Sequence, residues 1–161
     1  MPKFEIRPVE NQDDDKLELL DLFKQLYLYL VSKNRRFPLV KNGKMYWFDT
    51  ISKTNGKYSR LVGAFNSNKA LVGFANGFIG YLASYLGGLR VGQITHIFVL
   101  NTFSRKQVGS RLLTNLEIWF GSQGVKNIEA QVYDANATGL SFWIASGYSN
   151  LYINIIKGSD Q

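Results

Sequence analysis

Residues 94–120, ITHIFVLNTFSRKQVGSRLLTNLEIWF, decide the fold of the chain. Residues 94–100 form a β-branched and aromatic run, which predicts a strand buried on both faces. The last part of the stretch predicts a helix, because its apolar residues recur at helical spacing. These residues are Val108, Leu112, Leu113, Leu116, Trp119 and Phe120. A polar, basic turn with Gly109 at the start of the helix joins the two elements.

This turn is a candidate anion site. The backbone N–H groups in the first turn of a helix have no partner within the helix, and the helix dipole adds partial positive charge there. A strand that delivers a glycine-containing turn to a helix N-terminus can therefore bind phosphate. Arg105, Lys106 and Arg111 would add full positive charges. The alternative is an ordinary strand–helix turn whose basic side chains are solvated.

The composition excludes several classes of protein. A chain of 161 residues, of which 45% are hydrophobic, is typical of one globular domain. No run approaches the roughly 18–20 apolar residues that span a membrane, and residues 1–10 lack the apolar core of a secretion signal. We therefore expect a cytoplasmic protein without a membrane partner. The absence of cysteine excludes disulfides, and a single histidine, His96, excludes a histidine-rich metal site.

The net charge of +7 is concentrated in one segment. In residues 33–60, basic side chains are opposed only by Asp49. Because Tyr46, Trp47 and Phe48 lie within this basic segment, it could bind nucleic acid. No nucleic-acid motif accompanies the charge, so we favour a solvated segment and expect no nucleic-acid partner. The three aromatic residues are candidates for the wall of a pocket, and core packing against the main helices is the more common alternative.

The remaining elements follow from periodicity and turn signals. Strands are expected at residues 3–9, 61–65, 70–75, 127–133 and 151–156, and further helices from Asp13 to about Lys33, at residues 45–51 and at residues 136–145. Residues 66–69 join two strands as a hairpin, which forms an antiparallel meander with residues 94–100. The strand at residues 127–133 should run parallel to residues 94–100, through a right-handed crossover. This order predicts one mixed α/β or α+β domain over residues 1–161.

One motif identifies a family. The chain carries Asn136-x-x-Gly139-x-x-Phe142-Trp143-x-x-x-Gly147-Tyr148, and its spacing matches the pattern Asn-x-x-Ala-x-x-Phe-Tyr-x-x-x-Gly-Phe. Together with this motif, the chain has the hairpin and the candidate phosphate-binding turn at residues 104–110, called the phosphate turn below. With these features it resembles the GNAT superfamily of acyl-CoA-dependent N-acetyltransferases over nearly its whole length. The resemblance implies an α+β fold with a mostly antiparallel central sheet flanked by helices on both faces. It also implies acetyl-CoA as co-substrate and, as acceptor, a primary amine of a small molecule or peptide.

The phosphate turn departs from the family pattern Gln/Arg-x-x-Gly-x-Gly/Ala. Here the turn reads Ser104-x-x-Gln107-x-Gly109, so Gln107 puts a side chain where the backbone should approach phosphate closely. The resemblance nevertheless implies a set of residues that contact CoA. These are Ile97, Phe98, Val99, Arg105, Lys106, Gln107, Val108, Gly109, Ser110, Arg111, Asn136 and Trp143.

The resemblance further implies a mechanism in which the Val99 N–H polarises the thioester carbonyl. In the family, a tyrosine reprotonates the leaving thiolate, and the corresponding residue here is Trp143. Either another group supplies this proton, or CoA leaves as thiolate, which a thiol pKa of ~8.5 permits. Some members use a glutamate as general base, and the corresponding residue here is Gln131, which cannot act as a base. His96 is then the candidate general base, because histidine titrates near neutrality. A structural histidine is the alternative. Strand alternation should send Thr95 and His96 to opposite faces, so that only one of them faces the acceptor.

Two further alternatives follow from the differences between this chain and the family pattern. Loss of the turn glycine, the tyrosine and the glutamate is also consistent with a non-catalytic acyl-CoA-binding or sensing module. The family usually ends in two strands, whereas the chain after Tyr148 has room for one. A homodimer through the C-terminal strand is one way to complete the sheet.

Overall fold

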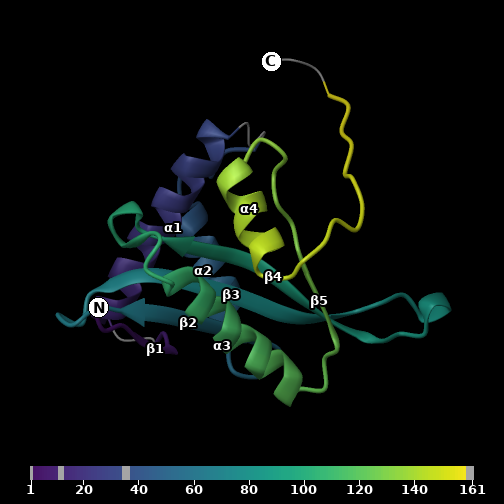
Figure 1. The fold of residues 1–161 in the computed structure, drawn as a ribbon, viewed down its shortest axis with the longest axis horizontal. Helices are drawn as coiled ribbons and strands as arrows, with labels where there is room; N and C mark the ends of the chain where they lie inside the picture. The colour runs from purple at the N-terminus through teal and green to yellow at the C-terminus, as the bar shows by residue number, and fades with distance from the viewer. Residues whose placement is uncertain (1, 11–12, 34–36, 159–161) are drawn as a thin grey trace.

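A computed structural model of the chain describes residues 2–10, 13–33 and 37–158. Five strands form one sheet in the order β1-β2-β3-β4-β5, in which only β4 and β5 run parallel. The strands are β1 (Glu5–Pro8), β2 (Ser59–Phe65), β3 (Leu71–Tyr81), β4 (Arg90–Val99) and β5 (Asn127–Ala130). The helices are α1 (Asp13–Ser32), α2 (Gly43–Ser52), α3 (Val108–Ser122) and α4 (Ala137–Ala145), with 3-10 turns η1 (Ser84–Leu86) and η2 (Asn101–Phe103). This architecture confirms the predicted α+β fold class (Figure 1).

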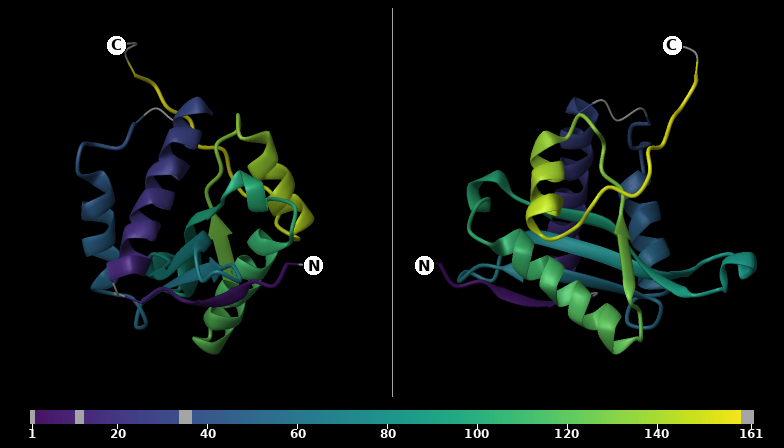
Figure 2. Two further views of the ribbon diagram at one scale, coloured as in Figure 1. Left: turned by 90° about the vertical axis from the view of Figure 1, so that its left-hand side faces the viewer. Right: turned by 45° about the vertical axis from the view of Figure 1, so that its right-hand side comes forward.

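The helices cover both faces of the sheet (Figure 2). α1 and α2 pack on one face, against apolar side chains of β2 and β3 that include Phe65 and Phe74. α3 and α4 pack on the other face, and all six residues of the predicted α3 stripe are buried. Gly77 and Gly92 make room for the Phe120 ring, because a Cβ at either position would lie 2.8 or 2.9 Å from it. The middle of the sheet is therefore held from both sides.

β4 is less buried than the sequence predicts. Ile94 is buried, but Thr95 is exposed and the residues from His96 to Val99 are half-buried. The prediction of burial on both faces is wrong for this half of the strand. β5 is shorter than predicted, and its pairing with β4 stops at Ile94 and Ala130. The second half of β4 therefore has no strand beside it on that edge.

The predicted strand at residues 151–156 is wrong. These residues form no helix or strand, and Ile153 and Ile155 are 88% and 89% exposed. The segment runs away from the sheet (Figure 1). An alternating apolar sequence is not sufficient for a strand, because its N–H and C=O groups need a neighbouring strand. No described segment provides one.

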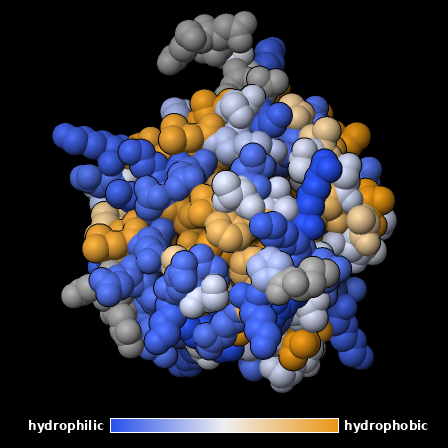
Figure 3. Space-filling view, turned by 60° about the vertical axis from the view of Figure 1, so that its left-hand side comes forward, coloured by the Kyte–Doolittle hydropathy of each residue, from blue (hydrophilic) through white to orange (hydrophobic). Residues whose placement is uncertain are grey.

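The basic segment contains α2. Phe48 and Ile51 of this helix are buried in the core, whereas Tyr46 is exposed. Arg35 and Arg36 lie outside the described residues. On the face drawn in Figure 3, hydrophilic side chains surround a central apolar area. No described helix is long and apolar enough to cross a membrane. The expectation of no nucleic-acid partner stays a prediction.

Candidate active site

The site begins at an irregularity between β3 and β4. Gly77 pairs with Ile94 and Asn76 pairs with His96, so Thr95 is an extra residue on β4 without a partner on β3. A bulge of this kind interrupts the alternation of side chains along a strand. Thr95 and His96 consequently line the same cavity, and His96 Nδ1 lies 3.0 Å from Thr95 Oγ1. The prediction that only one of them faces this side is wrong, because it assumed a regular strand.

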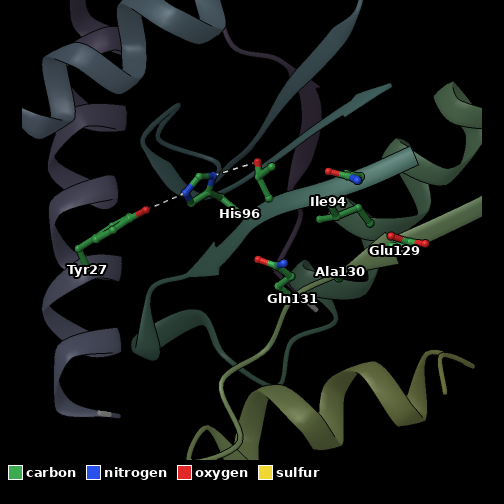
Figure 4. Close-up of a pocket in the computed structure, with 8 residues that line it drawn as sticks. Tyr27, Ile94, His96, Glu129, Ala130 and Gln131 are labelled. Carbon is green, nitrogen blue, oxygen red and sulfur yellow. Dashed lines mark hydrogen bonds between the residues drawn. The ribbon is translucent and has the colours of Figure 1, made fainter. Parts of the chain in front are cut away.

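The cavity has a volume of about 280 Å³ and opens where β4 and β5 cease to pair. α1, β4 and the end of β5 provide its lining, which is drawn in Figure 4. The lining residues are Tyr27, Gln93, Ile94, Thr95, His96, Glu129, Ala130 and Gln131. Of these, Glu129 alone is acidic. Ile128 and Ala130 pack with the α3 core, so the alternating residues Glu129 and Gln131 face the α1 side.

A chain of hydrogen bonds crosses the cavity wall. The Tyr27 hydroxyl lies 3.2 Å from His96 Nε2 (Figure 4), whereas Thr95 contacts the other ring nitrogen, Nδ1. The Thr95 hydroxyl donates to the Asn76 carbonyl at 3.2 Å and accepts from Asn76 Nδ2 at 3.0 Å. Asn76 is almost fully buried. The chain therefore links a residue of α1 to the interior of the sheet through His96.

Aromatic rings hold the imidazole of His96. Its ring centroid lies 5.2 Å from that of Phe23 and 5.6 Å from that of Trp47. Phe23 and Trp47 stack on each other with centroids 4.0 Å apart. Trp47 packs against the His96 ring from the α1 core but does not line the cavity, so the prediction of a pocket wall at residues 46–48 is wrong for this cavity. Tyr46 and Phe48 do not line this cavity.

The backbone of β4 beyond His96 is open on one edge. The Leu100 N–H donates to the Val72 carbonyl, so the pair Val99 and Gly73 is a non-hydrogen-bonded pair of the antiparallel ladder. The N–H and C=O groups of Val99, and by alternation those of Ile97, point away from β3. β5 does not extend to this level, and these groups face the gap. Phe98 differs, because its backbone faces β3 and its side chain packs with the α1 core.

The phosphate turn lies at the start of α3. Val108 is buried, whereas Arg105, Lys106, Gln107, Ser110 and Arg111 are exposed. The first intrahelical bond is from the Arg111 N–H to the Gln107 carbonyl, which leaves the N–H groups of residues 108–110 without a helical partner. The Gln107 side chain makes no capping hydrogen bond to them. Gly109 faces Phe142, since a Cβ there would lie 3.3 Å from that ring.

Two residues of the turn have a left-handed backbone. Gln107 has a φ of 61° and Arg105 a φ of 59°, a region that favours glycine. Gln107 occupies the position at which the family pattern has glycine, and its backbone has a conformation that glycine adopts without strain. A groove of about 320 Å³ along α3 also begins at Gln107, Ser110 and Arg111.

The motif that carries the resemblance builds α4. Asn136 caps this helix, because its side-chain oxygen accepts from the Gly139 N–H at 3.1 Å and from the Tyr29 hydroxyl at 2.7 Å. Trp143 is buried and packs edge to face on Phe142 and Tyr148. Among the candidate cofactor residues, Asn136 and Trp143 thus have structural roles of their own.

Tyr148, the last residue of this motif, contacts α3. Its hydroxyl donates to Glu117 at 3.0 Å. Burial, and secondly the hydrogen bond and charge of Glu117, raise the pKa of the Tyr148 phenol well above its ordinary value. Tyr148 therefore stays protonated at neutral pH and fixes the end of α4 to α3.

Comparison with known proteins identifies a family. The model of the Acetyltransferase (GNAT) family matches residues 18–148. No curated protein matches the sequence. The described residues contain no group of three His, Cys, Asp or Glu side chains that could hold a metal ion.

Solved structures share the fold at low sequence identity. Glucosamine-6-phosphate N-acetyltransferase from Arabidopsis thaliana superposes with a TM-score of 0.72 at 18% identity, over 98% of this chain and 99% of that one. An aminoglycoside N-acetyltransferase in complex with CoA gives 0.76 at 17% identity, over 99% and 96%. The BH1408 protein from Bacillus halodurans gives 0.81 at 14% identity, over 98% and 99%.

Proposed function

Because the chain belongs to the GNAT family of acetyltransferases, we propose that it transfers an acetyl group from acetyl-CoA to a primary amine of a small molecule or peptide. One observation carries this proposal. Val99 presents its backbone N–H to the gap beside β4, next to a cavity that contains His96. The Val99 N–H can polarise a thioester carbonyl held in the gap, while a base on the α1 side takes the amine proton.

The chain binds CoA, in this proposal, along the gap and the first turn of α3. The backbone of Ile97 and Val99 contacts the pantetheine arm, and the N–H groups of residues 108–110 bind the pyrophosphate. Arg105, Lys106 and Arg111 are exposed around that turn and supply positive charge. Asn136 and Trp143 act indirectly, by fixing α4 beside the turn.

His96 is the general base in this proposal. It lines the cavity and is held by hydrogen bonds at both ring nitrogens. General base catalysis typically contributes about 10²–10⁴-fold, so His96→Gln should lower kcat on that scale while the Kd of CoA changes little. A variant with near-normal turnover would show that His96 is structural.

A screen of amine acceptors with acetyl-CoA, measured by CoA release, tests the activity. The structural neighbours include enzymes for glucosamine-6-phosphate and for aminoglycosides. Both acceptors belong in the screen, together with a peptide that has a free N-terminus. The described lining of the cavity contains the acidic residue Glu129 and no lysine or arginine. We therefore expect amines that carry several positive charges to be better acceptors than the negatively charged phosphorylated sugar. CoA binding without turnover of any amine would identify the non-catalytic module instead.

We also propose that the C-terminal segment pairs with a second copy of the chain. β5 is an edge strand with one side unpaired, and Leu151, Ile153 and Ile155 are exposed. Each chain thus carries an unpaired strand edge and an exposed apolar segment. In a two-fold dimer, the C-terminal segment of each chain could pair with the β5 edge of the other. Light scattering should report a dimer, and a chain that ends at residue 150 should be a monomer. A monomeric full-length chain would refute this pairing.

A further inference from the structure

We propose that the hydroxyl of Tyr27, rather than the ring of His96, meets the acceptor amine, and that Tyr27 relays the amine proton to His96. The inference rests on the proposed acetyl transfer and deepens it, because it names the group of this chain that touches the reacting nitrogen. It follows from the directions of two hydrogen bonds of the His96 ring, one with Thr95 and one with Tyr27.

The Thr95 hydroxyl determines the first direction. A carbonyl oxygen can only accept, so the Thr95 proton goes to the Asn76 carbonyl at 3.2 Å. The Thr95 oxygen already accepts from Asn76 Nδ2 and has one lone pair left. With the Thr95 proton on the Asn76 carbonyl, we assign His96 Nδ1, which lies 3.0 Å away, as the donor to this oxygen. Asn76 is 3% exposed, so the inner end of this arrangement is buried.

The tautomer of His96 follows. A neutral imidazole carries one proton, and if Nδ1 holds it, Nε2 has a lone pair. The Tyr27 hydroxyl lies 3.2 Å from Nε2 and donates to it. The basic lone pair of His96 is thus directed at a phenol proton. Tyr27 also lines the cavity, with its hydroxyl directed at His96 (Figure 4), so in this proposal an acceptor amine in the cavity meets the Tyr27 oxygen.

The ring of His96 is not placed to turn toward the amine. Phe23 and Trp47 pack against it at centroid distances of 5.2 and 5.6 Å. Rotation would break both hydrogen bonds of the ring and push against two stacked aromatic side chains. Relay through Tyr27 needs no such movement.

The acetyl transfer through Tyr27 needs no reactant besides the amine and acetyl-CoA. The amine lone pair forms the N–C bond to the thioester carbonyl, the N–H proton passes to the Tyr27 oxygen, and the Tyr27 proton passes to His96 Nε2. The C–S bond then breaks, and CoA leaves as thiolate. The imidazolium returns its proton through Tyr27 to solvent, where the thiolate takes up a proton. The net products are the amide and CoA.

The variant Tyr27→Phe tests the relay. We expect kcat to fall about 10²–10⁴-fold, as in His96→Gln, with little change in the Kd of CoA or in Tm. Removal of the hydroxyl also frees the lone pair on Nε2. Activity equal to or above the wild type would therefore overturn the relay, because His96 would then take the proton directly. Tyr85→Phe is the matched control, since its hydroxyl lies on η1 and the residue is 86% exposed.

The double variant Tyr27→Phe, His96→Gln tests whether the two residues act as one unit. If Tyr27 acts through His96, the double variant should be no slower than the slower single variant. A rate loss equal to the product of the two single losses would show independent roles and overturn the relay.

A measurement on the wild type does not depend on any variant. The chain has one histidine, so a two-bond ¹H–¹⁵N spectrum of the untagged protein contains a single imidazole. We expect a proton on Nδ1 and a hydrogen-bonded lone pair on Nε2 when the ring is neutral. A proton on Nε2 in an enzyme that acetylates amines would overturn the relay alone. If the wild type acetylates no amine, the proposed function fails and the relay fails with it.

Discussion

Replacement of Gln107 by glycine should stabilise the protein and tighten its binding of CoA. Gln107 has a φ of 61° at the position directly before α3. A residue with a Cβ pays roughly 1–2 kcal/mol for a left-handed backbone, whereas glycine pays almost nothing. Glycine also has about 0.5–1 kcal/mol more conformational freedom to lose on folding. The net gain should be roughly 0.5–1 kcal/mol in the free energy of unfolding.

Two measurements test this prediction. For a chain of this length, a gain of 0.5–1 kcal/mol corresponds to a rise in Tm of about 1–4 °C. Glycine also lets phosphate approach the backbone, and one added hydrogen bond to a charged group would lower the Kd of CoA by roughly tenfold. Urea unfolding and calorimetric titration of CoA give the two values.

Lys69→Gly is the matched control. Lys69 has the same φ of 61°, but it lies in the turn between β2 and β3. It should show the same gain in stability with no change in the Kd of CoA. If Lys69→Gly is stabilising and Gln107→Gly is not, the backbone at Gln107 is not strained. An unchanged Kd in Gln107→Gly would place the pyrophosphate of CoA away from this turn.

Two further predictions concern packing around α3. Because burial and Glu117 raise the pKa of Tyr148, the unfolded chain loses this phenol proton first as pH rises above about 10, and stability then falls by at most about 1.4 kcal/mol per pH unit. Tyr148→Phe should remove this slope, and equal slopes in urea unfolding above pH ~10 would contradict it. Gly92→Ala should cost roughly 1–3 kcal/mol, because its Cβ would lie 2.9 Å from Phe120, whereas Gly121→Ala, with no atom within 4 Å, should be neutral or stabilising.

Much of the fold could be predicted from local periodicity. The stripe on α3 and the hairpin of β2 and β3 follow from residue type and spacing, and the structure confirms both. Residues 151–156 show the limit, because their alternation predicts a strand whether or not a partner edge exists. Only the three-dimensional arrangement shows that no described strand lies beside them.

The site could be predicted only in part. Residue type alone identifies His96 as a candidate, but its partner Tyr27 lies 69 residues earlier in the sequence, inside the helix predicted from Asp13 to about Lys33. A bulge shifts the register by one residue and has no sequence signature of its own. One signal was present: Asn76 is a single polar residue in an apolar strand, and a buried amide needs partners. Those partners are at Thr95, inside the bulge.

Two departures from regular geometry flank one short segment. The bulge at Thr95 precedes the open stretch of β4, and the left-handed residues Arg105 and Gln107 follow it. Between them, the side chain of Phe98 packs toward α1, whereas Ile97 and Val99 pack toward α3. The bulge therefore serves the face on which the acceptor is proposed to bind, and the turn serves the face of CoA. A regular strand would turn Thr95 or His96 away from the cavity, so the irregular backbone is what places both residues on the face proposed for the acceptor, opposite the face proposed for CoA.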